Sequence, residues 1–415
     1  MTPNPTTTIA IIGAALSANK GAAAMAETVI ERMPDHVGDC RFTVLTTYPA
    51  ADAGRLPHGS PARIVGLEPL RLALVEFPMA ILAFVARLCR VPLGWVRTRG
   101  CRAILDSDVV VDVAGISFAS GRGLPILVYN TLMTGTPLLL GVPTVKAAQA
   151  MGSFDALPNR LLARRVLPHL AAICARGQRT REHLDSLGLT NVVDVADLAF
   201  SLDESSSLPP AVAADVDRAG DGYIVVMPSS VVRGIVTRAG VDYVAAMAGL
   251  VSGIRRATGR SVVIAPHSYR VGRPEGRMND GPVCREVATA CAGDDGVVLV
   301  DADLTAGELR HLIAGSSVLV TSRFHAMISG LATCTPTIVV GWSHKYREVL
   351  DDFGLAQLGM DSDVLSDPSV VVAEVAKVLA DRDRLSAQIA AALPGVTARS
   401  ARNFEVIARV VGAAT

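Results

Sequence analysis

The sequence predicts an α/β protein built from two Rossmann-like parallel-sheet domains that face each other across a cleft. Three observations lead to this fold class. Apolar strand segments alternate with helical segments, the alternation restarts after a polar stretch near the middle, and 415 residues exceed what one compact core usually holds. Continuous apolar strands between helices are typical of a parallel sheet that is covered on both faces.

The first half contains five apolar strand segments with helical segments between them. Residues 8–12 are β-branched at four of five positions, and Gly13 and a small-residue stretch then lead into a helical segment. The other strand segments are residues 41–46, 108–113, 142–148 and 171–176. Together they predict an N-terminal Rossmann-like domain over residues 1–203.

A serine-rich stretch that ends in two prolines, residues 203–210, is the predicted linker. The pattern then restarts and predicts a C-terminal Rossmann-like domain over residues 211–415. Its strand segments are residues 223–227, 261–265, 296–300, 317–321 and 337–340. Thr305 and Glu308 have the spacing of a capping box at the start of a helix. Ligands of such domains bind at the carboxyl ends of the strands.

The composition excludes several classes of protein. Hydrophobic residues make up 50% of the chain, which is too apolar for intrinsic disorder. Lys+Arg 39 equals Asp+Glu 39, and this zero net charge argues against binding to nucleic acid through phosphate contacts. The seven cysteines include no C-x-x-C pair, which argues against a structural zinc site or a disulfide framework and favours a cytoplasmic protein.

Residues 71–97 are unusually apolar and end near Trp95. One interpretation is a buried helix pair of the first domain. The other is a helix that lies in a membrane interface with its arginines toward lipid head groups, so that the protein is peripheral at the inner membrane face. The longest charge-free run, residues 77–86, is far shorter than the ~20 residues that a spanning helix needs.

The strongest candidate site is the sequence Thr-Ser-Arg-Phe-His-Ala-Met at residues 321–327. Arg323 and His325 stand two residues apart where a strand segment runs into a helical one, so both side chains can converge on one ligand. The amino end of the helix suits a phosphate, and arginine offers a fork for phosphate or carboxylate oxygens. Histidine exchanges a proton near neutral pH. The alternative is a surface arginine in a salt bridge and a core histidine.

Weaker candidates follow three other strand segments of the second half. They are Arg233, His267 and Lys345. Each alone is typical of an ordinary loop, but with Arg323 and His325 they predict a basic cluster that binds a small anionic ligand.

The loop of residues 13–21 could cradle a phosphate or a sugar. It has neither the glycine pattern of a dinucleotide site nor the Gly-Lys-Ser/Thr of a P-loop. A nicotinamide cofactor and nucleotide hydrolysis are therefore not supported, and we expect no cofactor and no metal.

These motifs are similar to those of the polysaccharide pyruvyl transferase family over most of the chain. The matching segments are residues 19–21, 108–115, 141–149, 151–152, 154, 175–176, 197–200, 319–330, 335–336 and Lys345. The segment 319–330, which contains Arg323 and His325, resembles the signature of the family most specifically.

The resemblance implies a GT-B-like fold and a transfer from phosphoenolpyruvate to two hydroxyls of a sugar, which leaves a pyruvate ketal and free phosphate. The acceptor would be a sugar of a cell-surface polysaccharide or glycolipid, or a lipid-linked precursor. Arg323 and His325 would belong to the phosphoenolpyruvate site in the C-terminal domain, with His325 as acid/base. No metal is needed if arginines carry the phosphate charge.

The remaining candidates match less specific positions of the family pattern. Arg233, His267 and Lys345 would bind substrate, and so would Asn19, Lys20 and Gly21, which lie in the loop assigned to the acceptor side of the N-terminal domain. Three alanines follow Gly21 where the family loop often has an acidic residue. Two alternatives stay open: a GT-B glycosyltransferase that uses a nucleotide sugar, and a non-catalytic relative.

Overall fold

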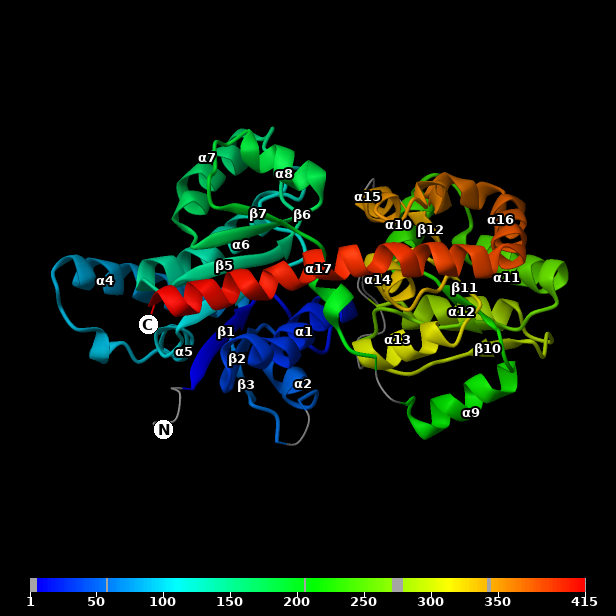
Figure 1. Cartoon of the computed structure of the whole chain (residues 1–415), viewed down its shortest axis with the longest axis horizontal. Helices are drawn as coiled ribbons and strands as arrows, with labels where there is room; N and C mark the ends of the chain where they lie inside the picture. The colour runs from blue at the N-terminus through cyan, green and yellow to red at the C-terminus, as the bar shows by residue number, and fades with distance from the viewer. Residues whose placement is uncertain (1–5, 57–58, 205–206, 271–278, 342–344, 415) are drawn as a thin grey trace. The chain divides into compact units, whose positions relative to one another are not determined.

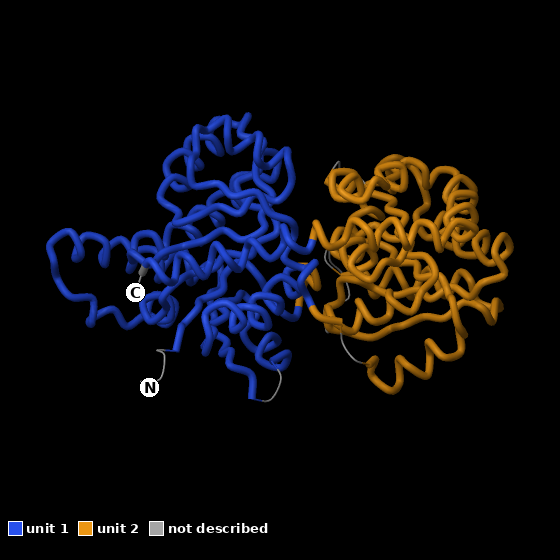
Figure 2. Tube along the Cα trace, viewed as in Figure 1, with its two compact units in different colours: residues 1–17, 22–202, 397–415 blue, residues 18–21, 203–396 orange. Residues whose placement is uncertain are grey.

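The chain folds as two compact units in a computed structural model that describes residues 6–56, 59–204, 207–270, 279–341 and 345–414 (Figures 1 and 2). The first unit comprises residues 1–17, 22–202 and 397–415, and the second comprises residues 18–21 and 203–396. Each unit contains one parallel sheet with helices against it. The predicted α/β fold class is confirmed.

The first unit contains a seven-stranded sheet in the order β3-β2-β1-β4-β5-β6-β7, and adjacent strands pair in parallel. The strands are β1 (Thr7–Ile12), β2 (Cys40–Thr46), β3 (Ala62–Gly66), β4 (Val109–Asp112), β5 (Thr144–Gln149), β6 (Ala172–Arg176) and β7 (Val192–Val195). The order reverses between β1 and β4, as in a doubly wound sheet. Five of these strands match the predicted segments, and β3 and β7 are additional.

Helices cover both faces of this sheet. They are α1 (Lys20–Val37), α2 (Pro49–Ala53), α3 (Pro69–Arg71), η1 (Leu72–Glu76), α4 (Phe77–Leu88), η2 (Leu93–Trp95), α5 (Arg99–Leu105), α6 (Leu124–Leu140), α7 (Leu157–Val166), η3 (Leu167–His169), α8 (Gln178–Asp185) and η4 (Leu198–Ser201). Because side chains alternate along a strand, Ile9 and Ile11 belong to one core, and Ala10 and Ile12 belong to the core on the opposite face.

The second unit contains a six-stranded parallel sheet in the order β10-β9-β8-β11-β12-β13. The strands are β8 (Ile224–Met227), β9 (Val262–Ile264), β10 (Val297–Leu299), β11 (Val318–Thr321), β12 (Thr337–Gly341) and β13 (Gly359–Asp361). Its helices are α9 (Pro210–Ala219), α10 (Ser230–Arg238), α11 (Tyr243–Thr258), α12 (Gly281–Ala290), α13 (Ala306–Ala314), α14 (Phe324–Ala332), α15 (Lys345–Asp351), η5 (Ala356–Leu358), η6 (Ser362–Ser366) and α16 (Pro368–Ala380), and α17 (Arg382–Ala414) continues into the first unit. The predicted capping box is confirmed, because Thr305 and Glu308 bond each other reciprocally at the start of α13.

The two units differ from the domains 1–203 and 211–415 in the segments 18–21 and 397–415. The C-terminal part of α17 completes a core of the first unit, where Phe404 and Ile407 are buried with Ile9. Asn403 fixes this placement, since its Oδ1 accepts the N–H of Ala148 at 3.0 Å. An amphipathic pattern shows that a helix covers a core, but it does not show which of two sheets the helix covers.

The segment from α3 to α4 is buried on one side only. Leu72, Glu76, Ala80 and Ala83 lie in the interior, whereas large apolar side chains on the other side are exposed. The interpretation of residues 71–97 as a buried helix pair is therefore wrong for the outer side.

A buried ion pair joins the carboxyl end of β4 to the middle of β5. Lys146 and Asp112 are register partners in these strands, and Nζ lies 2.5 Å from Oδ2 of the carboxylate. Both side chains are shielded from water, and the other carboxylate oxygen accepts the N–H of Ala114 at 3.0 Å. A charge at this depth needs its partner, because either ion alone would be buried without compensation.

Replacing Lys146 by methionine should therefore lower the free energy of unfolding by about 3–5 kcal/mol, since Asp112 would stay buried without its cation. The matched control is Lys377→Met on α16, where the side chain is 74% exposed and the change should stay within about 0.5 kcal/mol. Denaturant unfolding of both variants tests this. Equal losses at the two positions would contradict a stabilising role of the buried pair.

Candidate functional site

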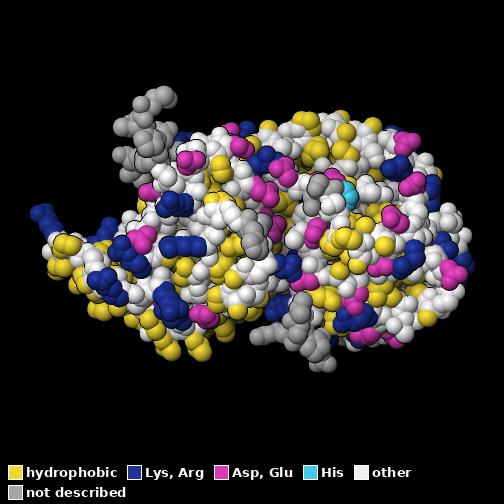
Figure 3. Space-filling view, turned by 90° about the horizontal axis from the view of Figure 1, so that it is seen from below, with side chains coloured by type: hydrophobic (Ala, Val, Ile, Leu, Met, Phe, Trp, Pro, Cys, Tyr) yellow, Lys and Arg dark blue, Asp and Glu magenta, His cyan; other side chains and the backbone are white. Residues whose placement is uncertain are grey.

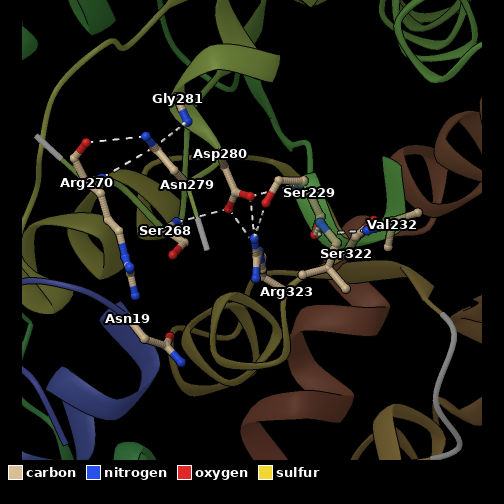
Figure 4. A network of polar contacts seen from close by, with 12 residues as sticks. Asn19, Ser229, Val232, Ser268, Arg270, Asn279, Asp280, Gly281, Ser322 and Arg323 are labelled. Atoms are coloured by element: carbon tan, nitrogen blue, oxygen red, sulfur yellow. Dashed lines mark hydrogen bonds and ion pairs between the residues drawn. The ribbon is translucent and has the colours of Figure 1, made fainter. Parts of the chain in front are cut away.

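Arg323 stands between β11 and α14, at the last non-helical position before the helix. Its Nε donates to Oδ2 of Asp280 at 2.8 Å, and its Nη2 donates to Oδ1 of the same carboxylate (Figure 4). Nη2 also lies 3.2 Å from Oγ of Ser230. Burial opposes the charged form of Arg323, but the carboxylate of Asp280 outweighs this and raises the pKa of the guanidinium above its usual value. Arg323 is thus a permanently charged side chain in one fixed orientation.

Asp280 connects three strand ends of the second unit. Its fully buried carboxylate accepts the N–H of Ser230 at 2.9 Å and the N–H of Ser268 at 3.0 Å, in addition to the guanidinium of Arg323. Ser230 follows β8, Ser268 follows β9, and Arg323 follows β11. The sequence-based set of site residues lacks Asp280. The signal that could have found it is that a buried arginine requires a carboxylate nearby.

His325 lies in the first turn of α14 and packs directly against the backbone of Gly21. A Cβ atom built on Gly21 would lie only 2.0 Å from Nδ1 of His325, so this contact requires glycine. Asn19 shapes the turn by accepting the N–H of Gly21 on its Oδ1 at 3.1 Å. The hydroxyl of Ser268 donates to the carbonyl of Ala18 at 3.4 Å and so ties this segment to the end of β9.

Lys20 completes the same segment with a second buried ion pair. Its Nζ lies 2.5 Å from Oδ1 of Asp303, and its side chain is 2% exposed. From the sequence, Asn19, Lys20 and Gly21 are expected on the acceptor side of the N-terminal domain. In the structure, residues 18–21 belong instead to the second unit, because they contact His325, Ser268 and Asp303.

His267, which follows β9, is almost completely buried. Burial, together with the nearby His325, Arg323 and Lys20, holds the pKa of His267 well below its usual value of 6.5. His267 is therefore a neutral imidazole at physiological pH. Its electrostatic neighbours place it within the same cluster as Arg323, His325 and Lys20.

Lys345 lies beside this cluster, whereas the side chain of Arg233 points to a different partner. Lys345 begins α15, and its Nζ lies 5.2 Å from the ring centroid of Phe324, within cation–π range beside the start of α14. Arg233 lies on α10, is 39% exposed and donates to Glu286 at 2.7 Å. Among the described residues, the guanidinium of Arg233 bonds to Glu286 and not to Asp280.

The described part of the site holds no metal cluster. Within those residues, no three His, Cys, Asp or Glu side chains come together as a metal ion would need. Arg273 and Arg277, which follow His267 in the sequence, lie outside the described residues, and so do residues 342–344 before Lys345.

Substituting alanine for Gly21 should displace the imidazole of His325 and lower the free energy of unfolding by about 1–3 kcal/mol, because the new methyl group has no space. The matched control is Gly249→Ala in α11, where a Cβ meets nothing within 4 Å and helix propensity favours alanine. Thermal unfolding of both variants, with the His325 ring signals followed by NMR, tests the contact. Equal stability of the two variants would contradict it.

The depressed pKa of His267 predicts a pH dependence of stability. The unfolded chain takes up a proton near pH 6.5 and the folded chain does not, so stability is present above this pH and is lost as the pH falls below it. A single such group changes the free energy of unfolding by at most about 1.4 kcal/mol per pH unit. His267→Gln should flatten the stability curve below pH 6.5 in denaturant titrations, whereas parallel curves would exclude a buried neutral His267.

Solved structures share this fold across the whole chain. UDP-GlcNAc 2-epimerase from Neisseria meningitidis, bound to UDP-GlcNAc, matches with a TM-score of 0.61 at 9% identity, over 97% of this chain and 99% of that one. Arabidopsis thaliana UGT89C1, complexed with UDP, matches with a TM-score of 0.56 at 12% identity, over 98% and 100%. Medicago truncatula UGT71G1, complexed with UDP-glucose, gives 0.54 at 12% identity, over 99% of each chain. The GT-B fold expected from the sequence is thereby confirmed.

No curated protein matches the chain. The family model described as polysaccharide pyruvyl transferase does match, over residues 19–344. This range begins at the segment that contacts His325 and includes all the residues of the cluster except Lys345. Because the match covers most of the sequence, the chain belongs to the polysaccharide pyruvyl transferase family.

Proposed function

We propose that this protein transfers a pyruvyl group from phosphoenolpyruvate to two hydroxyls of a sugar in a cell-surface polysaccharide or glycolipid, forming a pyruvate ketal and releasing phosphate. The observation that carries this proposal is the turn between β11 and α14. There, in a member of this family, Arg323 is held in one orientation by Asp280 and is followed two residues later by His325. A fixed arginine fork beside an acid/base suits a small ligand with a phosphate and a carboxylate.

The reaction needs one proton donor and a site for an anionic leaving group. A proton added to C3 of phosphoenolpyruvate makes the methyl group and leaves C2 electron-poor, and the first sugar hydroxyl then bonds to C2. The second hydroxyl bonds to C2 as the C2–O bond to phosphate breaks and its electron pair leaves with the phosphate. Of the two hydroxyl protons, one balances the proton taken up by C3 and the other leaves with the phosphate.

His325 is our candidate for the proton transfer. Its ring lies against the backbone of Gly21 and edge-on to Phe324, with the centroids 5.2 Å apart, so its position is restrained from two sides. The neighbouring His267 is neutral and buried, and we assign it a role in packing and positioning rather than in carrying charge.

Two of the cations in the cluster are already paired with acids, and this determines the roles that we assign to each. Asp280 already neutralises Arg323, and Asp303 neutralises Lys20. We therefore assign Arg323 the role of orienting donor oxygens through the guanidinium N–H groups that face away from Asp280. Lys345 and the amino end of α14 would supply the net positive charge that the phosphate and carboxylate require.

Phosphoenolpyruvate binding, measured by calorimetry, tests the donor site. Arg323→Lys keeps the charge opposite Asp280 but loses the fork, and should weaken binding about 10- to 100-fold. Arg233→Lys is the matched control, and should change binding by less than about twofold because the structure leaves this arginine outside the network. Equal effects of the two substitutions would remove Arg323 from the donor site.

Phosphate release with a sugar acceptor tests the chemistry. His325→Gln should bind phosphoenolpyruvate like the wild type but release phosphate about 10²- to 10⁴-fold more slowly. The solved neighbours complexed with UDP or UDP-glucose support one alternative, a glycosyltransferase that uses a nucleotide sugar. Thermal protection of the wild type by UDP and not by phosphoenolpyruvate would favour that alternative, whereas donor binding without phosphate release from any acceptor would favour a non-catalytic relative.

A further inference from the structure

The outer side of the continuous segment α3–η1–α4 carries a stripe of exposed apolar side chains. The stripe consists of Leu70, Leu74, Ile81, Leu82, Val85 and Leu88. The three most exposed are Leu70 at 75%, Leu74 at 72% and Leu88 at 69%. In Figure 3, apolar side chains gather at the left end of the molecule, where Figure 1 places α4, with Lys and Arg side chains next to them. A contiguous apolar surface of this kind marks a site of interaction.

The inner side of the same segment is part of the core of the first unit. Leu72, Ala80 and Ala83 are completely buried there. Glu76 is also fully buried, and its carboxylate accepts the N–H of Cys101 at 2.9 Å and lies 2.9 Å from Nε of Arg71. Pro69–Leu88 is long and apolar enough to cross a membrane. Its mean hydropathy is 1.8, and only 22% of the stretch is buried in the protein. Crossing would require these buried contacts to break, so the segment is suited to lie on a surface rather than to span it.

The charges around the stripe are almost all positive. Residues 69–105 contain six arginines and one acidic residue, and that residue is the buried Glu76. Arg87 and Arg90 lie near the carboxyl end of α4. At the other end of the stripe, a cavity of about 470 Å³ is lined by the arginines Arg63, Arg71, Arg97, Arg99 and Arg102, against the acids Glu68 and Asp106. In the described part of the chain, Arg97 and Arg99 form no ion pair with a carboxylate.

Apolar side chains with arginines at both ends match an anionic lipid surface. The leucines can pack among the acyl chains, and the lipid phosphates at head-group depth attract the arginines. A second copy of the chain fits less well. In a twofold dimer the same patch faces itself, which would bring an excess of arginines toward the same excess, with only Glu68 and Asp106 as acids beside them.

We propose that the stripe and its flanking arginines dock the protein peripherally on an anionic phospholipid bilayer. The leucines insert to the level of the acyl boundary, and Arg87, Arg90 and the arginines of the cavity contact lipid phosphates. The inference does not depend on pyruvyl transfer, and its test uses no phosphoenolpyruvate. It does fit an acceptor sugar carried on a lipid.

Sedimentation of the full-length protein with vesicles tests the proposal. One set of vesicles is phosphatidylcholine alone, and the other is phosphatidylcholine mixed with phosphatidylglycerol. Wild type should bind the mixed vesicles, and binding should fall at high salt because the arginine contacts are screened. The double substitution Leu74→Ser/Leu82→Ser should weaken binding roughly 100-fold, and Arg97→Gln/Arg99→Gln about 25-fold.

Matched controls lie on α7. Leu157 and Leu161 are also exposed, at 55% and 54%, and serine at both should leave vesicle binding unchanged. Arg164→Gln/Arg165→Gln is the corresponding control for charge. Circular dichroism and the melting temperature show that each variant is folded.

Three results would overturn the proposal. The first is that the wild type binds neither kind of vesicle, or that the α7 control substitutions weaken vesicle binding as much as the stripe substitutions do. The second is a wild-type dimer that Leu74→Ser/Leu82→Ser converts to a monomer, because a second copy then covers the stripe. The third is vesicle-bound protein that alkaline carbonate does not release, because the segment then spans the bilayer.

Discussion

The candidate site depends on one buried carboxylate. Asp280 accepts hydrogen bonds from the chain after β8, from the chain after β9 and from Arg323 after β11, so three loops of the second unit are held to a single group. A carboxylate can remain charged at zero exposure only when donors surround it in this way. The same contacts fix Arg323, which cannot change its orientation without leaving Asp280 buried and unpaired. The contacts that stabilise the three loops therefore also hold the guanidinium of Arg323 in place.

The segment 18–21 adds a second constraint to this cluster. Gly21 provides the contact that His325 packs against, and Lys20 is held by Asp303 in an ion pair shielded from water. Small residues in a loop after a first strand are usually interpreted as a cradle for a ligand. Here the smallness of Gly21 is required by a histidine of the same protein. Asn19, Lys20 and Gly21 make these contacts although no acidic residue follows Gly21.

The sequence predicts the interior strands well and the edges poorly. The strands it misses are β3, β7 and β13, and each is an edge strand with largely half-exposed residues. Edge strands lack the continuous apolar run that identifies a strand buried on both faces. The residues of the site are likewise predicted only in part. Arg323 and His325 belong to one local motif, but Asp280 is separated from Arg323 by 43 residues, and their pairing is revealed only when the sheet brings the strand ends together.

Zero net charge conceals two different uses of charge in this protein. In the interior, three cations each pair with one acid: Lys146 with Asp112, Arg176 with Asp197, and Arg323 with Asp280. Within residues 69–105 the arginines outnumber the acids six to one, and the single acid, Glu76, is buried. Charges on a protein surface are felt over about 10 Å at moderate salt, so a partner at this face experiences the local arginines and not the sum over the chain. A protein with no net charge can therefore present a basic face, and its position beside exposed leucines determines the kind of surface that it fits.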